Sequence, residues 1–383
     1  MLNQRWKTKI PESQYKDRRP SPYRDFNRVT PLITEHGIFA GGYGCLCRLD
    51  RNTGEILTSV PLPVAKGTSE APIVVIRRAT SSLLIASSHG RVLGLDPITL
   101  TQRWITKLPR SKSYPSTPLL CHAPSIDSTD VRIYAAPPGF VFRLDPQTGR
   151  TLARNDVCGC GYKPVSLGIG HSKEEVLARI KRNLYALDPF TPRTRWQNRL
   201  DDPNSYKGLN PAVLMNISTA YKGTLYHVSG INGAKLDKFC LKMKEDTIMV
   251  LDAPNKRVYI GIDGYAICVS TEGEKLKNLW NVSLPSSGHS VTQVALGPNN
   301  GRVYFANNGY VFALEIGGNI VSANALSGFG GKMTNLHASS DMIVVGIDGH
   351  CIALETGNGG SNEARGAIHA PLPSYWETKK EKP

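Results

Sequence analysis

Short apolar runs that alternate with small or polar residues recur in pairs along the chain, and a tight turn rich in Gly or Asn separates most pairs. Alternation with a period of two predicts a strand with one buried face. A turn of this composition between two such runs predicts a β-hairpin. Seven hairpins are clear, at residues 37–50, 83–96, 132–145, 176–188, 257–270, 302–315 and 342–355.

The hairpins belong to a longer repeat. Most of them end in an acid, and five of these acids are Asp50, Asp96, Asp145, Asp188 and Glu315. The residues eight positions later are Thr58, Trp104, Ala153, Trp196 and Ala323. A period of about 45 residues built from short strands is typical of a β-propeller. An eighth hairpin begins at residues 224–230 and then decays, so we predict an all-β chain with one propeller of eight blades, or of seven if residues 224–246 are an insertion.

The two ends of the chain predict how the ring closes. Residues 4–11 match residues 102–109 at six of eight positions, while no outer strand follows the last hairpin. We therefore expect residues 3–11 to complete the last blade, which removes an exposed sheet edge. On this reading residues 1–356 form the propeller, residues 12–28 form a loop within it, and residues 357–383 are a disordered tail.

Composition narrows the class of protein. The net charge is +15, from 46 Lys and Arg against 31 Asp and Glu, but the charges are spread over many repeats without a nucleic-acid-binding motif, so we expect no nucleic-acid partner. No apolar stretch is long enough to span a membrane, and no signal peptide is evident at the N-terminus. We expect an intracellular, cytoplasmic monomer with no membrane partner, whose eight Cys are free thiols.

The turn that follows each hairpin resembles the repeat of the pyrroloquinoline-quinone (PQQ) dehydrogenase-like propellers. The residues that carry the resemblance are Leu144–Gly149, Leu95–Pro97 with Trp104, Leu187–Pro189 with Trp196, Leu49–Asp50 with Thr53–Gly54, and Trp280 in a longer version. The resemblance covers about residues 3–355. It implies a propeller in which this Trp docks between neighbouring blades.

The resemblance is less specific for activity, because the same repeat builds both quinone enzymes and cofactor-free scaffolds. The quinone enzymes hold PQQ and Ca²⁺ and carry two adjacent cysteines, whereas the nearest pair here is Cys158-Gly159-Cys160. We predict no cofactor, neither PQQ nor calcium, and no metal site. Cys158 and Cys160 are interpreted as part of a Gly-rich loop, the alternative being a metal or redox pair.

The face that bears the hairpin turns is the candidate site. In propellers these turns surround the central channel together with the loops between blades, and here they carry Tyr43, His89, Asp263, Tyr265, Asn308, Tyr310, Asp348 and His350. Asp-Gly and Asn-Gly are also the pairs that a two-residue hairpin requires, so turn geometry alone accounts for part of this pattern.

Two classes of function remain. The first is a cofactor-free binding or scaffold module that recognises a protein or small-molecule ligand on the turn-bearing face. The alternative is an enzyme that cyclises, isomerises or otherwise rearranges a small natural product in the central pocket by positioning and a few hydrogen bonds. A PQQ-dependent dehydrogenase is the least favoured. The loop 12–28 is either a lid over such a pocket or a simple linker.

Overall fold

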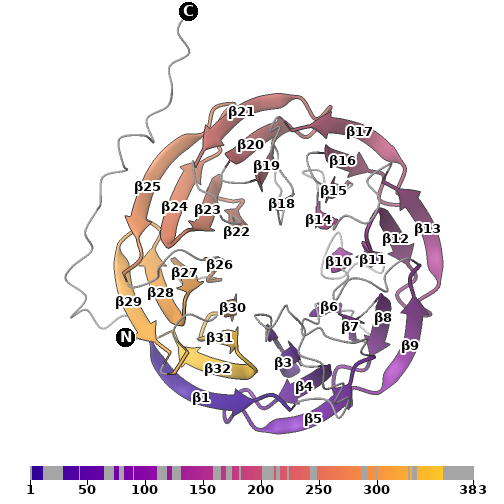
Figure 1. Ribbon diagram of the computed structural model, residues 1–383, viewed down its shortest axis with the longest axis vertical. Helices are drawn as coiled ribbons and strands as arrows, with labels where there is room; N and C mark the ends of the chain where they lie inside the picture. Colours follow the sequence, from indigo (N-terminus) through magenta and orange to yellow (C-terminus); the bar gives the residue numbers. More distant parts are fainter. Residues whose placement is uncertain are drawn as a thin grey trace, which may run out of the picture.

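Each pair of apolar runs forms the two middle strands of a four-stranded antiparallel sheet, and these sheets are arranged radially in a ring (Figure 1). The computed structural model describes residues 2–11, 29–42, 44–63, 73–76, 82–88, 90–109, 119–122, 131–157, 165–169, 175–180, 183–200, 211–212, 216–221, 224–241, 248–285, 292–298, 301–326, 328–329 and 334–356. These residues are all-β, without a helix. Nowhere in these ranges does an apolar helix reach the length of a bilayer crossing.

The described strands form eight four-stranded sheets, numbered here in chain order with strands A to D running from the centre of the ring outwards. Sheets 1 to 4 contain β2 (Thr30–Thr34), β3 (Gly37–Gly42), β4 (Cys45–Leu49), β5 (Ile56–Pro61); β6 (Ile73–Ile76), β7 (Leu83–Ser88), β8 (Arg91–Leu95), β9 (Gln102–Lys107); β10 (Leu119–His122), β11 (Arg132–Ala135), β12 (Phe140–Leu144), β13 (Thr151–Asp156); and β14 (Ser166–Ile169), β15 (Val176–Ile180), β16 (Asn183–Leu187), β17 (Thr194–Arg199).

Sheets 5 to 8 follow the same plan, except that the outer strand of sheet 8 comes from the N-terminus. They contain β18 (Pro211–Ala212), β19 (Asn216–Tyr221), β20 (Thr224–Ser229), β21 (Lys235–Cys240); β22 (Ile248–Asp252), β23 (Arg257–Ile262), β24 (Tyr265–Ser270), β25 (Lys277–Ser283); β26 (Gln293–Leu296), β27 (Arg302–Asn307), β28 (Tyr310–Glu315), β29 (Ile320–Ala325); and β30 (Thr334–Ala338), β31 (Met342–Ile347), β32 (His350–Glu355) with β1 (Asn3–Lys9).

The hydrophobic core is divided among the interfaces between sheets. Eight buried clusters each join one sheet to the next, and one of them joins sheet 8 to sheet 1. Strands B and C carry most of these side chains, because both of their faces pack against neighbouring sheets. Each fully buried Leu, Ile or Val contributes about 1.5–3 kcal/mol, so the interfaces hold the ring together.

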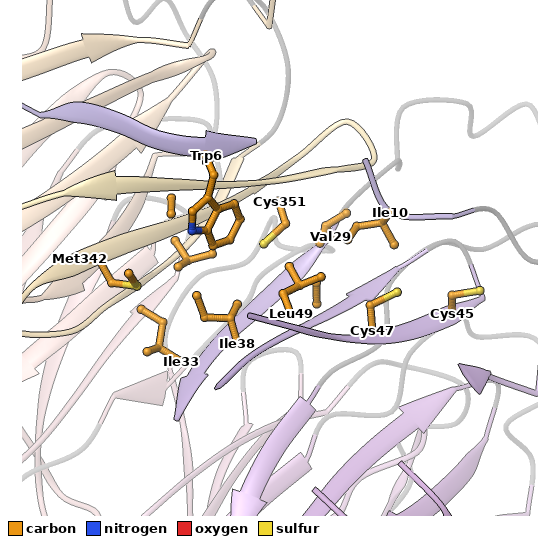
Figure 2. Close-up of a cluster of buried hydrophobic side chains, with 13 residues drawn as sticks. Trp6, Ile10, Val29, Ile33, Ile38, Cys45, Cys47, Leu49, Met342 and Cys351 are labelled. Atoms are coloured by element: carbon orange, nitrogen blue, oxygen red, sulfur yellow. The ribbon is translucent and has the colours of Figure 1, made fainter. Parts of the chain in front are cut away.

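Strand β1 joins the two ends of the chain. It pairs antiparallel with β32, with Trp6 opposite Ala353 and Lys9 opposite His350. The cluster between sheets 8 and 1 contains Trp6 and Ile10 from the N-terminal segment beside Cys351 of β32 (Figure 2). Residues 3–9 therefore occupy the outer position of sheet 8, next to the last hairpin.

A Trp on strand D docks each even-numbered sheet onto the next sheet. The indole nitrogens of Trp104, Trp196 and Trp280 donate hydrogen bonds of 3.1, 3.2 and 2.8 Å to carbonyls of Pro146, Gly230 and Ile316, and Trp6 does the same to Arg51 at 3.1 Å. The ring of each Trp lies so close to a turn glycine that an added Cβ would clash, at Gly54, Gly149, Gly233 and Gly318. The glycines are needed for this approach as well as for their positive φ angles.

Sheets 1, 3 and 5 use a different contact at the same level. In the even-numbered sheets, strand C places a small residue opposite the Trp of strand D, namely Gly94, Ala186, Cys268 or Ala353. In sheets 1, 3 and 5 the large residue is instead on strand C, and Arg48, Arg143 and His227 contact the carbonyls of Ile98, Phe190 and Glu274 in the next sheet. From sheet 1 to sheet 6 the two kinds of contact therefore alternate.

Two details of the sequence interpretation are corrected. Residues 224–229 form strand C of sheet 5, not the start of a hairpin, because the preceding strand B lies at 216–221. Ser229 stands at the position of the acid and Asp237 at the position of the Trp, which concealed the register. In sheet 7 a shorter turn places Ser322, not Ala323, at the Trp position opposite Ala313.

Candidate binding faces of the ring

The sheets present two faces, one at each end of their strands. We call the face with the turns between strands B and C the B–C face, and the opposite face, with the turns between strands C and D, the C–D face. The six described candidates Asp263, Tyr265, Asn308, Tyr310, Asp348 and His350 lie on the B–C face, in the consecutive sheets 6, 7 and 8. Tyr43 and His89 lie outside the described residues, as do Cys158, Cys160 and the loop 12–28.

The turns of sheets 6 to 8 have one backbone geometry. Their first residues have positive φ angles, 51° at Asp263, 54° at Asn308 and 41° at Asp348, and the glycine that follows each has φ between 75° and 83°. Positive φ at both central residues is the type I′ hairpin turn, which favours Asp-Gly and Asn-Gly. Turn geometry therefore explains these residue types, and it also holds their side chains in fixed directions on the face.

The residue after each turn glycine begins strand C and packs against an aromatic or apolar neighbour. Tyr310 stacks on Phe312 with ring centroids 6.1 Å apart, and His350 meets Phe329 edge-on at 5.1 Å. Tyr265 packs against the cluster between sheets 5 and 6. All three side chains are half-buried, so their bodies are anchored while part of each stays accessible.

Hydrogen bonds from outside the hairpins hold the turns rigid. The carbonyls of Gly264, Gly309 and Gly349 accept bonds of 2.8 Å from the N–H groups of Leu284, Leu326 and Ile10, which follow strand D of the same sheets. The fully buried Thr292 links two sheets, because its Oγ1 accepts from the N–H of Gly264 at 3.1 Å and from Asn307 Nδ2 at 2.6 Å.

Sequence reasoning missed Thr292. It lies just before β26, in a connection between sheets where no repeated motif marks it. The only sequence signal is a hydroxyl residue immediately before an inner strand, which is too common to single out.

Three of the described cysteines are fully buried core residues. Cys47, Cys268 and Cys351 are fully buried in the interfaces between sheets, and burial raises the pKa of Cys47 and of Cys268 to about 12. Within the described ranges, no three His, Cys, Asp or Glu side chains are grouped so that they could hold a metal ion.

The C–D face is built from turns in which an acid binds the backbone. Asp50, Asp96, Asp145 and Asp188 each accept hydrogen bonds of 2.8–2.9 Å from the N–H groups two and three residues later. Burial alone would raise the pKa of Asp188, but bonds from the Thr191 N–H and from Arg195 lower it to about 2. Asp188 is therefore ionised, and all four acids hold the backbone of their turns.

Comparison with solved structures shows the same fold. BamB from Moraxella catarrhalis has a TM-score of 0.61 at 17% identity, covering 94% of this chain and 100% of that chain. The C-terminal WD40 domain of Sif2 gives 0.63 at 12% identity, covering 93% and 99%, and Saccharomyces cerevisiae Sqt1 gives 0.65 at 12%, covering 93% and 100%. No curated protein sequence matches the chain.

The family comparison is more specific than these structural likenesses. The family model described as outer membrane protein assembly factor BamB matches residues 137–363, which is more than half of the chain. This region contains the acid-bearing turns at Asp145 and Asp188 and the docking residues Trp196 and Trp280. The chain therefore belongs to the PQQ-like β-propeller repeat family that this model describes.

Proposed function

We propose that the chain is a cofactor-free binding module that recognises a protein partner through the B–C face of sheets 6 to 8. The observation that carries the proposal is the arc of three identical type I′ turns, each followed by Tyr or His. The arc presents carboxylate, amide, phenol and imidazole groups on rigid backbone. Tyr is enriched at protein interfaces because it combines apolar area with a hydrogen-bonding group.

The family supports a binding role. The matching family model is described as an assembly factor, which is a statement about that protein and is extended to this chain only as part of the proposal. The proposal includes neither PQQ nor calcium.

The experiment compares wild type with the triple variant Tyr265→Ala, Tyr310→Ala, His350→Ala. The type I′ turn residues are unchanged, so the hairpins keep their geometry. Proteins captured from a lysate of the source cell are identified and quantified by mass spectrometry. We expect a defined set of partners to be lost from the triple variant.

The matched control is Ile105→Ala on β9. Ile105 is 44% exposed on the outer strand of sheet 2, away from the B–C face of sheets 6 to 8. Partner capture by this control should equal that of wild type. If the triple variant captures the same partners as wild type, the B–C face is not the binding site. If native mass spectrometry of the purified wild type finds a retained small molecule, the ligand is that molecule and not a protein.

We also propose that the eight sheets are eight blades of a single ring spanning residues 1–356. The clusters that join every sheet to the next, including sheet 8 to sheet 1, support this count. Limited proteolysis should leave β1 to β32 associated as one particle on gel filtration, whereas release of a folded fragment would contradict it.

A further inference from the structure

The C–D face carries exposed apolar side chains at one repeated turn position. In sheets 1 to 5 the turn is held in the same way, with the residue at its start donating to a carbonyl near its end. The second residue after that start is Asn52, Ile98, Gln147, Phe190 or Ile231. Asn52 and Gln147 show that the turn accepts polar residues, so turn geometry does not require Ile or Phe at the other positions.

The three apolar side chains are open to solvent. Ile98 is 54% exposed, Phe190 50% and Ile231 90%. None of them belongs to a buried cluster of the described residues. The hydrogen bonds that Ile98 and Phe190 accept from Arg48 and Arg143 use their backbone carbonyls, so these bonds do not require the side chains.

The ring places these side chains on one plane. Equivalent positions in successive sheets of a propeller lie at the same height along the ring axis, so the turns of sheets 2, 4 and 5 project from the same face. The turn of sheet 3, which carries Gln147, separates Ile98 from Phe190 and Ile231. A flat surface that accepts individual side chains, as the interface of a bilayer does, would contact all three at once.

Phe190 is held in a fixed position. The guanidinium carbon of the buried Arg132 lies 4.1 Å from the centre of the Phe190 ring, and that of Arg143 lies 5.5 Å away. The ring therefore has support on the protein side and remains half-exposed.

Charge on the same face favours an anionic surface. Arg150 and Arg193 are exposed at the ends of the turns of sheets 3 and 4, and neither side chain forms an ion pair with a described residue. Asp96 and Asp188 are paired with Arg103 at 2.6 Å and Arg195 at 2.9 Å, which neutralises them. Cations beside exposed apolar side chains favour binding to a membrane that contains acidic lipids.

We propose that the C–D face of sheets 2 to 5 binds an anionic lipid surface, with Ile98, Phe190 and Ile231 entering the headgroup region. The proposal concerns the face opposite to the protein-binding site and is independent of that site. It requires no membrane-spanning segment.

The first test is flotation of the purified full chain with phosphatidylcholine vesicles that contain about one third phosphatidylserine, and with phosphatidylcholine alone. Wild type should bind the mixed vesicles and lose binding at high salt. The triple variant Ile98→Asn, Phe190→Gln, Ile231→Gln should bind at least about tenfold less. The matched control is Ile105→Asn, which removes a similarly exposed Ile from the outer side of sheet 2 and should bind like wild type. Melting temperatures of all variants establish that they fold.

A second readout measures insertion directly. Vesicles with brominated acyl chains should quench the fluorescence of an Ile231→Trp variant more strongly than that of an Ile105→Trp variant. The proposal would be overturned if wild type binds neither kind of vesicle or if the triple variant binds like wild type. Equal quenching at both positions would overturn it too. Binding to soluble polyglutamate but not to vesicles would overturn it as well, in favour of an acidic protein partner.

Discussion

The indole nitrogen of Trp6 donates a hydrogen bond of 3.1 Å to the carbonyl oxygen of Arg51, and this bond links the N-terminal strand to sheet 1. Thr8 Oγ1 adds a bond of 2.6 Å to the carbonyl of Gly54 in the same turn. Trp104 and Thr106 make the equivalent bonds to Pro146 and Gly149 within the continuous chain. The junction of the chain ends therefore uses the same contacts as an ordinary junction between sheets.

Removal of residues 1–11 should lower the melting temperature sharply, because β32 loses its partner strand and the cluster around Trp6 and Ile10 opens. Differential scanning calorimetry measures the change. A synthetic peptide of residues 2–11 should restore part of the stability in trans. The same peptide with Trp6→Ala should restore much less, since truncation of a buried Trp costs about 3–5 kcal/mol. An unchanged melting temperature after the deletion would contradict closure by β1.

Gly54→Ala should destabilise the protein by about 2–4 kcal/mol. Part of the loss is strain, because Gly54 has a φ of 73°, and part is a clash, because the new Cβ would lie 2.5 Å from the Trp6 ring. Gly273→Ala is the control for strain alone, since its φ is 77° and nothing lies within 4 Å of its added Cβ. Urea denaturation of both variants separates the two contributions. Equal losses would show that the approach to Trp6 is unimportant.

Much of this architecture could be predicted from the sequence, because a repeat shows several copies of the same structural unit. The copy of residues 102–109 at 4–11 identified the closing strand, and Asp-Gly and Asn-Gly identified the turns of sheets 6 to 8. The alternation between Trp on strand D and Arg or His on strand C was missed. It depends on which residues face each other across a β-bulge, as Trp104 faces Gly94, and a spacing count does not show this.

The sites were less predictable for a physical reason. The B–C face depends on Thr292, which reaches the turn of a neighbouring sheet from a connection with no repeated pattern. On the C–D face the signal was available, because Ile98 and Phe190 stand where other copies of the turn have Asn or Gln. An apolar residue in a strand-rich sequence is usually buried, so only its exposure in the structure distinguishes it.

Thiol reactivity should separate the described cysteines into two classes. Cys240 is exposed and should react with a maleimide in the native protein. Cys47, Cys268 and Cys351 should react only after unfolding, because they are fully buried and burial raises the pKa of each thiol. Peptide mapping by mass spectrometry gives the extent at each site. Native labelling of Cys351 would indicate that the junction between sheets 8 and 1 opens readily.

The acid of the C–D turn should give sheet 4 a pH-dependent stability. The pKa of Asp188 in the folded protein is about 2, below the value of about 3.9 for an unfolded Asp. Its contribution is therefore fully present above pH of about 4 and is lost as the pH falls towards 2. Asp188→Ala should cost about 1–2 kcal/mol at neutral pH, because two turn N–H groups and Arg195 lose their acceptor, and the deficit should shrink in acid.

Ser229 provides the control, since it occupies the same turn position in sheet 5 and its hydroxyl accepts from the Ile231 N–H at 3.3 Å without titrating. Ser229→Ala should therefore cost the same free energy of unfolding at every pH in this range. Urea denaturation of the wild type and both variants between acid and neutral pH measures the two differences. If the loss of unfolding free energy in Asp188→Ala stays constant down to the lowest pH, the charge of the carboxylate contributes no more than an uncharged hydrogen-bond acceptor would.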